Sequence, residues 1–479
     1  MSDYEFEKLV EEIQNAGGRP FLVGGYVRDH LLHREMTFKD RDLEVFGLYP
    51  NQLKNICRRF GRVMTVGAAF AVLKVILSDD EVVDVSIPRR ETWIGEGHKG
   101  FDVQSDPFMT IREAAERRDL TINAISMEPI TKEIIDPLNG IRDLEKKLLR
   151  HVSHRFEEDP LRVLRVLQFS ARLGFSIAVE TRQLCTEMVK KGSLSSLPRE
   201  RIEEEFKKLL CQGKSDMISR VFKNGYKMGI WRAVLPELDD LYSVKQDSRY
   251  HSEGNCFYHT VLTVKSMMEI AQRDHLEDDH RFMLGLAALG HDLGKKLTTK
   301  RDENGSIIAH GHEKAGVPIA QTMLRRITST RWILESALAL IAAHMRPLHL
   351  VTAEKVTDAA IRRLANDVHP ATLEDLARLV EADTRATMRS DGQESANAHI
   401  FLRERAGQLG VDHSPPKPVF QGRDLMRLAH ANILPERFRQ GGPHYKTVLD
   451  AVYEAQLDGH VNDIADAEKF AIDFINTMI

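Results

Sequence analysis

Two aspartates one residue apart, Asp40 and Asp42, have a type and spacing that could support chemistry. In a strand, side chains alternate between the two faces, so both carboxylates would lie on one face and Arg41 on the other. Neighbouring carboxylates repel each other unless a cation lies between them, and Mg²⁺ prefers such oxygen ligands. Asp84, in EVVDVSIP, offers a third carboxylate on a neighbouring predicted strand. These residues predict metal-assisted nucleotidyl transfer, in which one ion activates a 3′-hydroxyl and another orients the triphosphate.

A glycine turn precedes the aspartates. Gly24 and Gly25 follow the apolar stretch PFLV, and a turn without Cβ atoms lets backbone N–H groups approach phosphate oxygens. Arg28 could add a charge-assisted hydrogen bond to the same phosphates. Taken alone, a Gly-Gly turn is usually only a turn, and an Asp-x-Asp pair is usually a solvated strand edge. Their occurrence together, in this order, favours a nucleotide site.

A second group of candidate ligands is rich in histidine. His291 and Asp292 are adjacent in the apolar stretch LAALGHDLGKK. Both side chains are costly to bury without a partner. A metal ion provides a partner, because imidazole and carboxylate groups are common metal ligands. The sequence therefore predicts a second metal site, separate from the aspartates near the N-terminus.

Different elements must position these two groups. PFLVGG, AVLKVIL and EVVDVSI are predicted strands, because they are short and rich in Val, Ile and Leu. Beyond them the pattern is nearly all helical, with apolar residues at three- and four-residue steps in RVLRVLQFSARLGF and RIEEEFKKLLCQG. The prolines of GVDHSPPKPVFQG mark a linker before the last helices. The predicted fold class is α+β. The predicted domains are a head with a small mixed β-sheet (1–135), an all-α neck and body (136–245), an all-α histidine-rich domain (246–405) and a helical tail (406–479).

Composition agrees with a multidomain globular protein. The 479 residues are 42% hydrophobic and 29% charged, and a net charge of −4 argues against indiscriminate nucleic-acid binding. The N-terminus is an acidic amphipathic stretch rather than a signal peptide, and no apolar run is long enough to cross a membrane. The four cysteines form no C-x-x-C pair, which favours reduced thiols and a cytoplasmic location.

Several segments together resemble a known superfamily. LVGGYVRDHLL…KDRDLEVFG, RRDLTINAI, DPLNGIRDLEKKLLRHV, FEEDPLRVLRVLQFSARLGF and SLPRERIEEEFKKLL are similar, in this order, to the motifs of class II tRNA nucleotidyltransferases and bacterial poly(A) polymerases. The resemblance implies that Arg117, Arg118 and Asn123 contact the triphosphate and ribose. It also implies CTP, ATP and the acceptor arm and 3′ end of tRNA as partners. EKKLLRHVSHR is either a tRNA contact or a solvated basic face.

The stretch EEDPLRVLR carries a further argument about base choice. Asp159 and Arg162 are three residues apart, so on a helix they would share one face. A carboxylate accepts a hydrogen bond and a guanidinium donates one, which matches the Watson–Crick edges of cytosine and adenine and mismatches guanine and uracil. The resemblance implies this selecting role for the pair, with Arg165 assisting. The alternative is an ordinary salt bridge on a helix surface.

The histidine block resembles an HD phosphohydrolase domain. His259, His291, Asp292 and Asp383 match its H…HD…D pattern, and His312 and His344 match the extra ligands of two-metal members. His310 and His349 are weaker candidates. The chemistry implied is attack of metal-activated water on a phosphoester. Imidazole ligands favour a transition metal such as Ni²⁺, Mn²⁺ or Co²⁺.

The head and the HD block together resemble the enterobacterial type of CCA-adding enzyme. The nearest alternatives are an A-adding enzyme, a CC-adding enzyme and a poly(A) polymerase. Residues 91–116 occupy the place of the flexible loop that CCA-adding enzymes use to switch from CTP to ATP, which disfavours a CC-only enzyme. An alternative from another class is a phosphohydrolase with a non-catalytic RNA-binding head, but the intact Asp40, Asp42 and Asp159 argue against it. The oligomeric state, the natural HD substrate and the roles of the N-terminal helix and C-terminal tail stay open.

Overall fold

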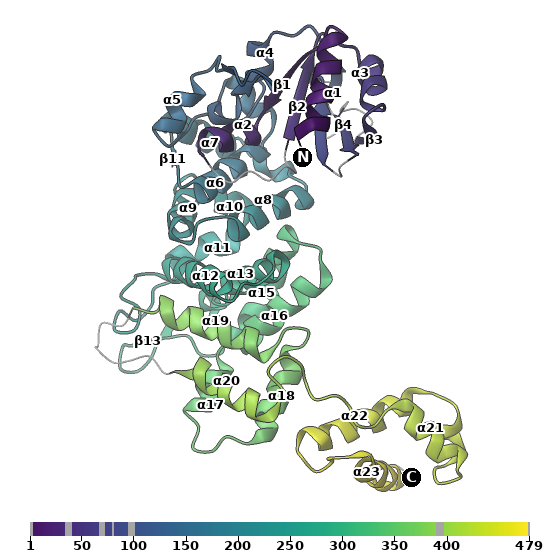
Figure 1. Ribbon diagram of the computed structural model, residues 1–479. Coiled ribbons are helices and arrows are strands. Elements are labelled where there is room, and N and C mark those ends of the chain that lie inside the picture. Colours follow the sequence, from purple (N-terminus) through teal and green to yellow (C-terminus); the bar gives the residue numbers. More distant parts are fainter. Residues whose placement is uncertain are drawn as a thin grey trace. The chain divides into compact units, whose positions relative to one another are not determined.

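The computed structural model describes residues 3–33, 41–66, 72–78, 81–93, 101–388 and 397–477 (Figure 1). The chain divides into two compact units, Met1–Val234 and Leu235–Ile479.

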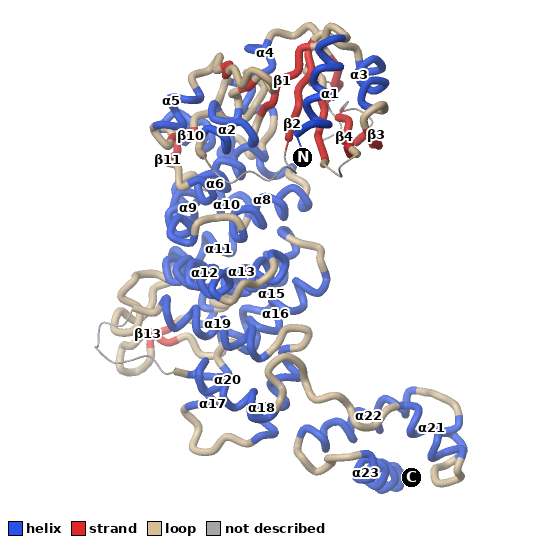
Figure 2. The backbone as a smooth tube through the Cα atoms, viewed as in Figure 1, coloured by secondary structure: helices blue, strands red, loops and turns tan. Residues whose placement is uncertain are grey.

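A mixed β-sheet forms the centre of the first unit (Figure 2). Among the described residues, its strand order is β3-β4-β5-β2-β1-β8-β9. Strands β2 and β5 are parallel, and the other neighbours are antiparallel. The strands are β1 (Arg19–Val23), β2 (Arg41–Phe46), β3 (Gly61–Val66), β4 (Val72–Leu77), β5 (Val82–Ser86), β8 (Ser126–Met127) and β9 (Ile134–Ile135). The predicted strands PFLVGG, AVLKVIL and EVVDVSI correspond to β1, β4 and β5, so these three predictions are confirmed.

Helices complete the first unit. Helix α1 lies beside β1 and α3, so the N-terminal stretch is helical as expected (Figure 1). Helix α6 packs against α8 and α9, and it ends at Gly174, whose φ of 77° suits glycine. The helices are α1 (Asp3–Asn15), α2 (Gly25–Leu31), α3 (Pro50–Cys57), α4 (Ile111–Ala115), α5 (Gly140–Glu145), α6 (Leu161–Leu173), α7 (Val179–Lys190), α8 (Arg199–Cys211), α9 (Ser215–Lys227) and α10 (Ile230–Val234). The predicted α+β class is confirmed.

The stretch expected to be a flexible loop, residues 91–116, contains regular structure. Strands β6 (Arg89–Trp93) and β7 (Phe101–Ser105) pair as an antiparallel hairpin, and α4 follows them. Thr110 caps α4 by accepting a hydrogen bond from the backbone N–H of Glu113. Residues 94–100, between these strands in the sequence, lie outside the described residues. Two short strands, β10 (Leu148–Leu149) and β11 (Ser176–Ile177), pair in parallel further along the chain.

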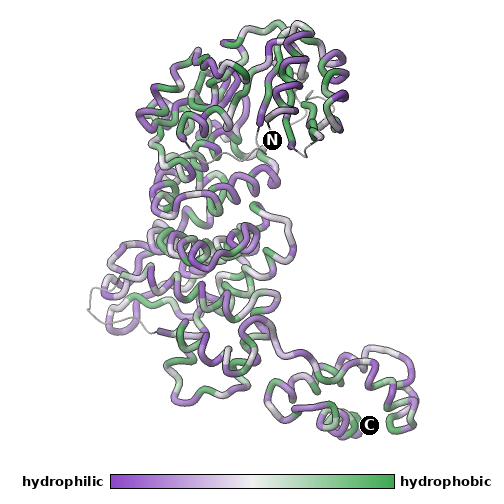
Figure 3. The backbone as a smooth tube through the Cα atoms, viewed as in Figure 1, coloured by the Kyte–Doolittle hydropathy of each residue, from purple (hydrophilic) through white to green (hydrophobic). Residues whose placement is uncertain are grey.

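The second unit is almost entirely helical. Helix α12 packs against α13 and α19, and α16 packs against α13 and α15. Figure 3 shows polar and apolar residues intermixed along these helices, as expected for amphipathic helices. The helices are α11 (Pro236–Asp240), α12 (Cys256–Arg273), α13 (Asp278–Gly290), α14 (Lys295–Thr298), α15 (His312–Ile327), α16 (Arg331–Ala343), α17 (Arg346–Val351), α18 (Asp358–Val368), α19 (Leu373–Ala386), α20 (Ala398–Leu409), α21 (Gly422–His430), α22 (Pro443–Leu457) and α23 (Ile464–Thr477). A short hairpin joins β12 (Lys300–Arg301) and β13 (Ile307–Ile308). No described helix has the length and apolar character needed to span a bilayer.

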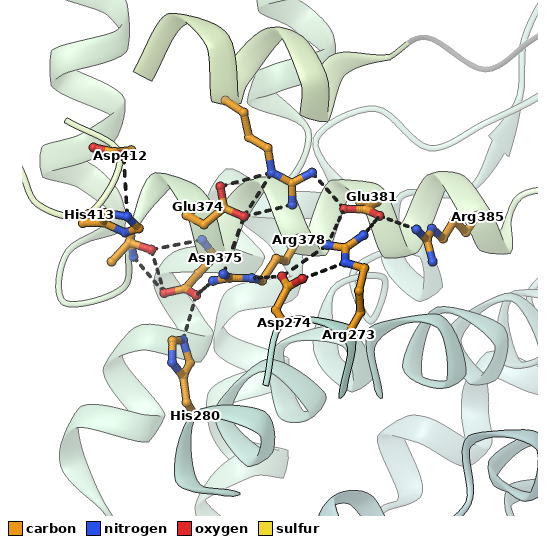
Figure 4. Close-up of polar contacts among 12 residues, drawn as sticks. Arg273, Asp274, His280, Glu374, Asp375, Arg378, Glu381, Arg385, Asp412 and His413 are labelled. Atoms are coloured by element: carbon orange, nitrogen blue, oxygen red, sulfur yellow. Dashed lines mark hydrogen bonds and ion pairs between the residues drawn. The ribbon is translucent and has the colours of Figure 1, made fainter. Parts of the chain in front are cut away.

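A network of charges holds α19 in place (Figure 4). Glu381 is buried on α19, and its two oxygens accept hydrogen bonds from Arg273 of α12 at 2.6 Å and Arg403 of α20 at 2.9 Å. Asp375, one and a half turns earlier, accepts a hydrogen bond from His280 of α13 at 2.7 Å. Helices α12 and α19 carry His259 and Asp383, so this network fixes the spacing of two candidate metal ligands.

Candidate active sites

The predicted metal carboxylates of the head meet on adjacent strands. Asp42 of β2 and Asp84 of β5 are directly opposite each other in the parallel register. Asp84 Oδ1 is buried and has no hydrogen-bond partner among the described residues. A buried carboxylate oxygen beside a second carboxylate is the donor set that a hard divalent cation prefers, so these residues fit Mg²⁺. Asp40 lies outside the described residues.

The glycine turn approaches these carboxylates closely. Gly24 has φ +72° and ψ −133°, a conformation that residues with a Cβ rarely adopt. A Cβ at Gly24 would lie 3.3 Å from Asp42 Oδ2 and 3.2 Å from Arg118 Nη1. Glycine therefore brings the turn between β1 and α2 into contact range of one carboxylate and one cation.

A pocket of about 680 Å³ joins most of the predicted head residues. Among those that line it are Gly25, Arg28, Asn123 and Arg165. Sequence reasoning did not single out the residues that complete the wall, which are Gln168, Phe169 and Arg172 of α6, Lys208 of α8 and Gln212 directly after α8. The lining residues are Gly24, Gly25, Tyr26, Arg28, Asp29, Arg41, Asp42, Asp84, Arg118, Asp119, Asn123, Arg165, Gln168, Phe169, Arg172, Lys208 and Gln212.

A chain of hydrogen bonds links four residues that line this pocket. Arg28 Nη1 donates to Asn123 Oδ1 at 2.8 Å, and Asn123 Nδ2 donates to Asp119 Oδ1 at 2.9 Å. Arg165 Nε donates to the other oxygen of Asp119 at 2.8 Å. The guanidinium groups of Arg28 and Arg165 each lie 5.2 Å from the ring centre of Phe169. The network therefore holds the guanidinium groups of Arg28 and Arg165 in contact with the ring of Phe169.

Asp119 is the central residue of this network, and sequence reasoning missed it. Burial alone would raise its pKa, but the charge of Arg165 and the hydrogen bond from Asn123 lower it to about 2. The available signal was its position in RRDLTINAI, four residues before Asn123, although an acid after two arginines is common in surface helices.

The predicted base-reading pair has a different geometry from the one expected. Asp159 lies before helix α6 in an extended conformation, and Pro160 separates it from the first helical residue, Leu161. The expectation that Asp159 and Arg162 share one helical face is therefore wrong. Asp159 accepts two hydrogen bonds from Arg201 of α8, at 3.1 and 2.8 Å.

Arg162 also has its donors engaged by the protein. Its Nη1 donates to the carbonyl oxygen of Arg155 at 2.7 Å, and its Nη2 donates to that of Arg117 at 2.6 Å. Neither Arg162 nor Asp159 is among the residues that line the 680 Å³ pocket. Arg165, the predicted assistant, does line it.

All six predicted ligands of the second unit converge. His259 Nε2 lies 2.8 Å from Asp383 Oδ1, and His291 Nε2 lies 3.3 Å from Asp292 Oδ2. Two groups of potential ligands share Asp292: one contains His259 and His291, and the other contains His312 and His344.

The two halves use different oxygens of Asp292. His291 and His259 lie near its Oδ2, at 3.3 and 3.7 Å, whereas His312 Nε2 lies 3.2 Å from its Oδ1. His312 Nε2 is in turn 3.1 Å from His344 Nε2. Asp292 could therefore contribute a ligand oxygen to either half of the cluster.

Backbone carbonyl groups set the orientation of three of these rings. The Nδ1 atoms of His291, His312 and His344 lie 2.7–2.8 Å from the carbonyl oxygens three residues earlier. A carbonyl oxygen only accepts, so each Nδ1 carries a hydrogen and each Nε2 is the ring nitrogen that faces the cluster. His291 Nε2 is buried without a hydrogen-bond partner in the described structure. Imidazole nitrogens presented in this way fit a transition metal.

His259 is oriented by a carboxylate instead, and sequence reasoning missed that residue. Glu253 Oε1 lies 2.9 Å from His259 Nδ1 and 2.8 Å from His251 Nδ1. Burial opposes a charge on His259, but its hydrogen bonds to Asp383 and Glu253 raise its pKa to about 9. At His344 burial and the neighbouring histidine charges lower the pKa to about 3, which keeps its ring in the neutral, metal-binding form.

A second pocket, of about 360 Å³, adjoins this cluster. It is lined in part by His312, Lys295 and His251, and by His310 and His349. The last two residues, weaker candidates as ligands, thus lie in the pocket wall and not in any of the ligand groups found among the described residues.

The fold and the two sites define a nucleotidyltransferase head followed by a helical metal-binding HD domain. Matches to family models agree with this class: "Poly A polymerase head domain" over residues 20–150, "Probable RNA and SrmB-binding site of polymerase A" over 174–242 and "HD domain" over 256–371. The multifunctional CCA protein of Xanthomonas campestris pv. campestris is 34% identical over 396 residues, which cover 82% of this chain and 91% of that protein. The multifunctional CCA protein of Methylobacillus flagellatus is 36% identical over 372 residues, covering 77% and 84%. The chain belongs to the family of the multifunctional CCA proteins.

Solved structures show the same fold. The Bacillus stearothermophilus CCA-adding enzyme in complex with CTP matches with a TM-score of 0.61 at 21% identity, covering 99% of this chain and 98% of that one. The Thermotoga maritima CCA-adding enzyme complexed with tRNA matches with a TM-score of 0.57 at 17% identity, covering 98% and 94%.

Proposed function

We propose that the chain is a CCA-adding tRNA nucleotidyltransferase, which adds C, C and A to the tRNA 3′ end from CTP and ATP without a nucleic-acid template. The observation that carries the proposal is the in-register pair of Asp42 and Asp84 in the wall of a pocket that also contains the Gly24 turn and Arg118. The family relationship supports the same activity.

In the proposed reaction, the tRNA 3′-oxygen forms a bond to the α-phosphorus, and the bond from that phosphorus to the pyrophosphate oxygen breaks. Asp40, Asp42 and Asp84 would hold Mg²⁺, which would supply positive charge to activate the 3′-hydroxyl and to neutralise the triphosphate. Gly24 and Gly25 present backbone N–H groups to the phosphates.

Arg118 contributes positive charge beside the glycine turn, because its Nη1 would lie 3.2 Å from a Cβ at Gly24. Its Nη2 is 3.6 Å from Glu44 Oε2, which helps to hold the guanidinium there. Arg28 and Asn123 form the ribose and phosphate side of the pocket, held by Asp119. Asp159, Arg162 and Arg165 remain the proposed base-selecting residues. Selection by Asp159 requires that its bidentate contact with Arg201 opens or is shared with the base.

The HD domain is proposed to hydrolyse phosphoesters with a transition metal such as Ni²⁺, Mn²⁺ or Co²⁺. One ion would be held by His259, His291, Asp292 and Asp383, and a second by Asp292, His312 and His344. The convergence of their Nε2 and carboxylate atoms, and the 360 Å³ pocket beside them, support this proposal. The head, with oxygen ligands, is proposed to use Mg²⁺.

The domain division 1–135, 136–245, 246–405 and 406–479 is retained as a proposal, with the tRNA acceptor arm bound by the neck and body. A cytoplasmic location is proposed because the four cysteines, Cys57, Cys185, Cys211 and Cys256, are buried and form no C-x-x-C pair.

Product analysis tests the transferase proposal against its relatives. Three tRNA transcripts, ending before CCA, after C and after CC, are offered CTP and ATP separately, and products are resolved to one nucleotide. A CCA-adding enzyme extends the first two with CTP and the third with ATP. Extension by CTP alone, by ATP alone, or by long A tracts would indicate a CC-adding enzyme, an A-adding enzyme or a poly(A) polymerase. No extension of any transcript would leave a phosphohydrolase with a binding head.

A further inference from the structure

Gln168 is a buried amide in the wall of the 680 Å³ pocket. Its side chain is on helix α6, and the residue is only 1% exposed. Its Nε2 atom has no hydrogen-bond partner among the described residues. Buried side-chain donors nearly always have a partner, so an unpaired one that lines a pocket calls for a ligand acceptor.

Two cationic residues of the same pocket wall, Arg165 and Lys208, differ from Gln168 because each already pairs with a carboxylate. Arg165 is bound to Asp119 at 2.7 and 2.8 Å. Lys208 Nζ lies 2.6 Å from Glu204 Oε1. These groups give the wall its positive charge, but their hydrogen bonds are committed to the protein.

The position of Gln168 within the wall also points to a ligand. Arg165, Gln168 and Arg172 are spaced by three and four residues, so they share one face of α6. Lys208 of α8, which packs against α6, and Gln212 directly after α8 extend the same pocket wall. The Gln168 amide therefore lies in a row of positively charged side chains, where an electron-rich oxygen would be stabilised.

We propose that Gln168 is a nucleotide-binding residue whose Nε2 donates a hydrogen bond to an acceptor oxygen of the nucleotide in this pocket. The proposal rests on the transferase function proposed above. The acceptor belongs either to the incoming CTP or ATP or to the 3′-terminal nucleotide of the tRNA, since both carry phosphate and ribose oxygens. The experiment separates the two sources.

Two substitutions of similar size isolate the donor. Gln168→Met keeps the volume and removes the hydrogen-bonding group, whereas Gln168→Glu replaces the amide nitrogen by oxygen. Gln183→Met, on the exposed face of α7, is the matched control. The full-length variants are assayed for KM and kcat toward CTP and ATP at saturating tRNA, and toward tRNA at saturating nucleotide. Thermal unfolding is recorded for each variant with and without CTP.

Loss of this one hydrogen bond is expected to raise one KM roughly tenfold in Gln168→Met, with a larger increase in Gln168→Glu and no change in Gln183→Met. A higher KM for CTP and ATP would assign the acceptor to the incoming nucleotide. A higher KM for tRNA would assign it to the tRNA 3′ end. Without ligand, Gln168→Met should unfold no earlier than the wild type, because it removes an unpaired buried donor.

Three results would overturn the proposal: unchanged KM values for all substrates in folded Gln168→Met and Gln168→Glu, a fall in kcat alone, or a lower unfolding temperature of ligand-free Gln168→Met with a normal KM. A wild-type chain that adds no nucleotide would instead refute the proposed function. In that case the CTP-induced shift in unfolding temperature still tests the Gln168 contact.

Discussion

Asp42 and Asp84 face each other across the only parallel strand pair described in the seven-stranded sheet, β2 and β5. Two residues opposite each other in a parallel pair project from the same face, so their carboxylates belong to one site. Forty-two positions separate them in the chain, and only the strand register brings them together. The chemistry of the head therefore depends on the correct pairing of β2 with β5.

Removal of either carboxylate charge should stop nucleotide addition. In Asp42→Asn and Asp84→Asn, the rates of C and A addition should fall by orders of magnitude, because each change removes a metal ligand needed in the transition state. The measurement is single-turnover extension of tRNA in Mg²⁺. Glu133→Gln, an exposed acid of the same unit, is the control. Near wild-type extension by a folded Asp42→Asn or Asp84→Asn would refute the head assignment.

Asp119 should act as a positioning residue with a defined effect on stability. In Asp119→Asn, Arg165 loses its ion-pair partner, and the KM for CTP and ATP should rise. The protein should also lose about 2 kcal/mol of stability at neutral pH, from a pKa lowered from 3.8 to about 2. The measurement is denaturant unfolding, followed through the transition that bound CTP shifts.

The pH dependence of that difference has a definite sign. A carboxyl group whose pKa is lower in the folded state stabilises the protein above the unfolded pKa, and this contribution disappears as pH falls through the folded pKa. The stability difference between wild type and Asp119→Asn should therefore be constant near neutral pH and decrease between about pH 4 and about pH 2. A difference that is the same at pH 7 and pH 3 would show that the ion pair with Arg165 does not account for it.

Base selection should depend on Asp159. In Asp159→Ala, UTP and GTP should compete better with CTP and ATP, with a loss of about 1–3 kcal/mol of discrimination if one bidentate base contact is removed. Competition among the four nucleotides on one tRNA measures this effect. Arg201→Ala tests the contact with Arg201 separately from the proposed contact with the base, because it removes the Arg201 guanidinium and keeps the Asp159 carboxylate. Unchanged selectivity in Asp159→Ala would reduce the residue to a structural partner of Arg201.

The HD ligands should serve hydrolysis alone. His291→Ala and Asp292→Asn should abolish metal-dependent hydrolysis of p-nitrophenyl phosphate and of a 2′,3′-cyclic nucleotide, while tRNA extension continues. The proposed transfer residues and the HD ligands lie in different units of the chain. Loss of extension in a folded His291→Ala variant would show that the two sites are coupled. Absence of hydrolysis by the wild type with Ni²⁺, Mn²⁺ or Co²⁺ would leave the HD cluster as a structural element.

Glu253 should control metal affinity without binding the metal. In Glu253→Gln, the partner of His259 Nδ1 changes from a carboxylate to an amide, and metal affinity should fall about 10- to 100-fold. The concentration of Ni²⁺ or Mn²⁺ that gives half-maximal hydrolysis measures the change, and Glu303→Gln is an exposed control. An unchanged metal requirement would limit Glu253 to its contact with His251.

Local patterns predicted the elements and many of the candidate residues, but not all of their geometry. Short Val- and Ile-rich runs identified β1, β4 and β5 because such runs suit a buried sheet. The helical placement of Asp159 was wrong, and Pro160 was the available warning, since a residue before proline disfavours the α conformation. Asp119 escaped notice because its partner Arg165 is distant in sequence, and such pairing has no local signature. Glu253 lies only six residues before His259, but it precedes helix α12, so helical spacing did not connect the two.

The contact between Lys295 and Asp292 gives the HD cluster a built-in counterion. The Lys295 ammonium lies 2.7 Å from Asp292 Oδ2, the same oxygen that faces His291 and His259. A divalent ion bound at that oxygen would repel the ammonium, so metal uptake amounts to an exchange of one cation for another. Lys295 also lines the adjoining 360 Å³ pocket, and displacement from Asp292 would leave its charge for an anion there. In the proposed hydrolase, binding of the metal would therefore also release a positive charge for binding an anionic substrate.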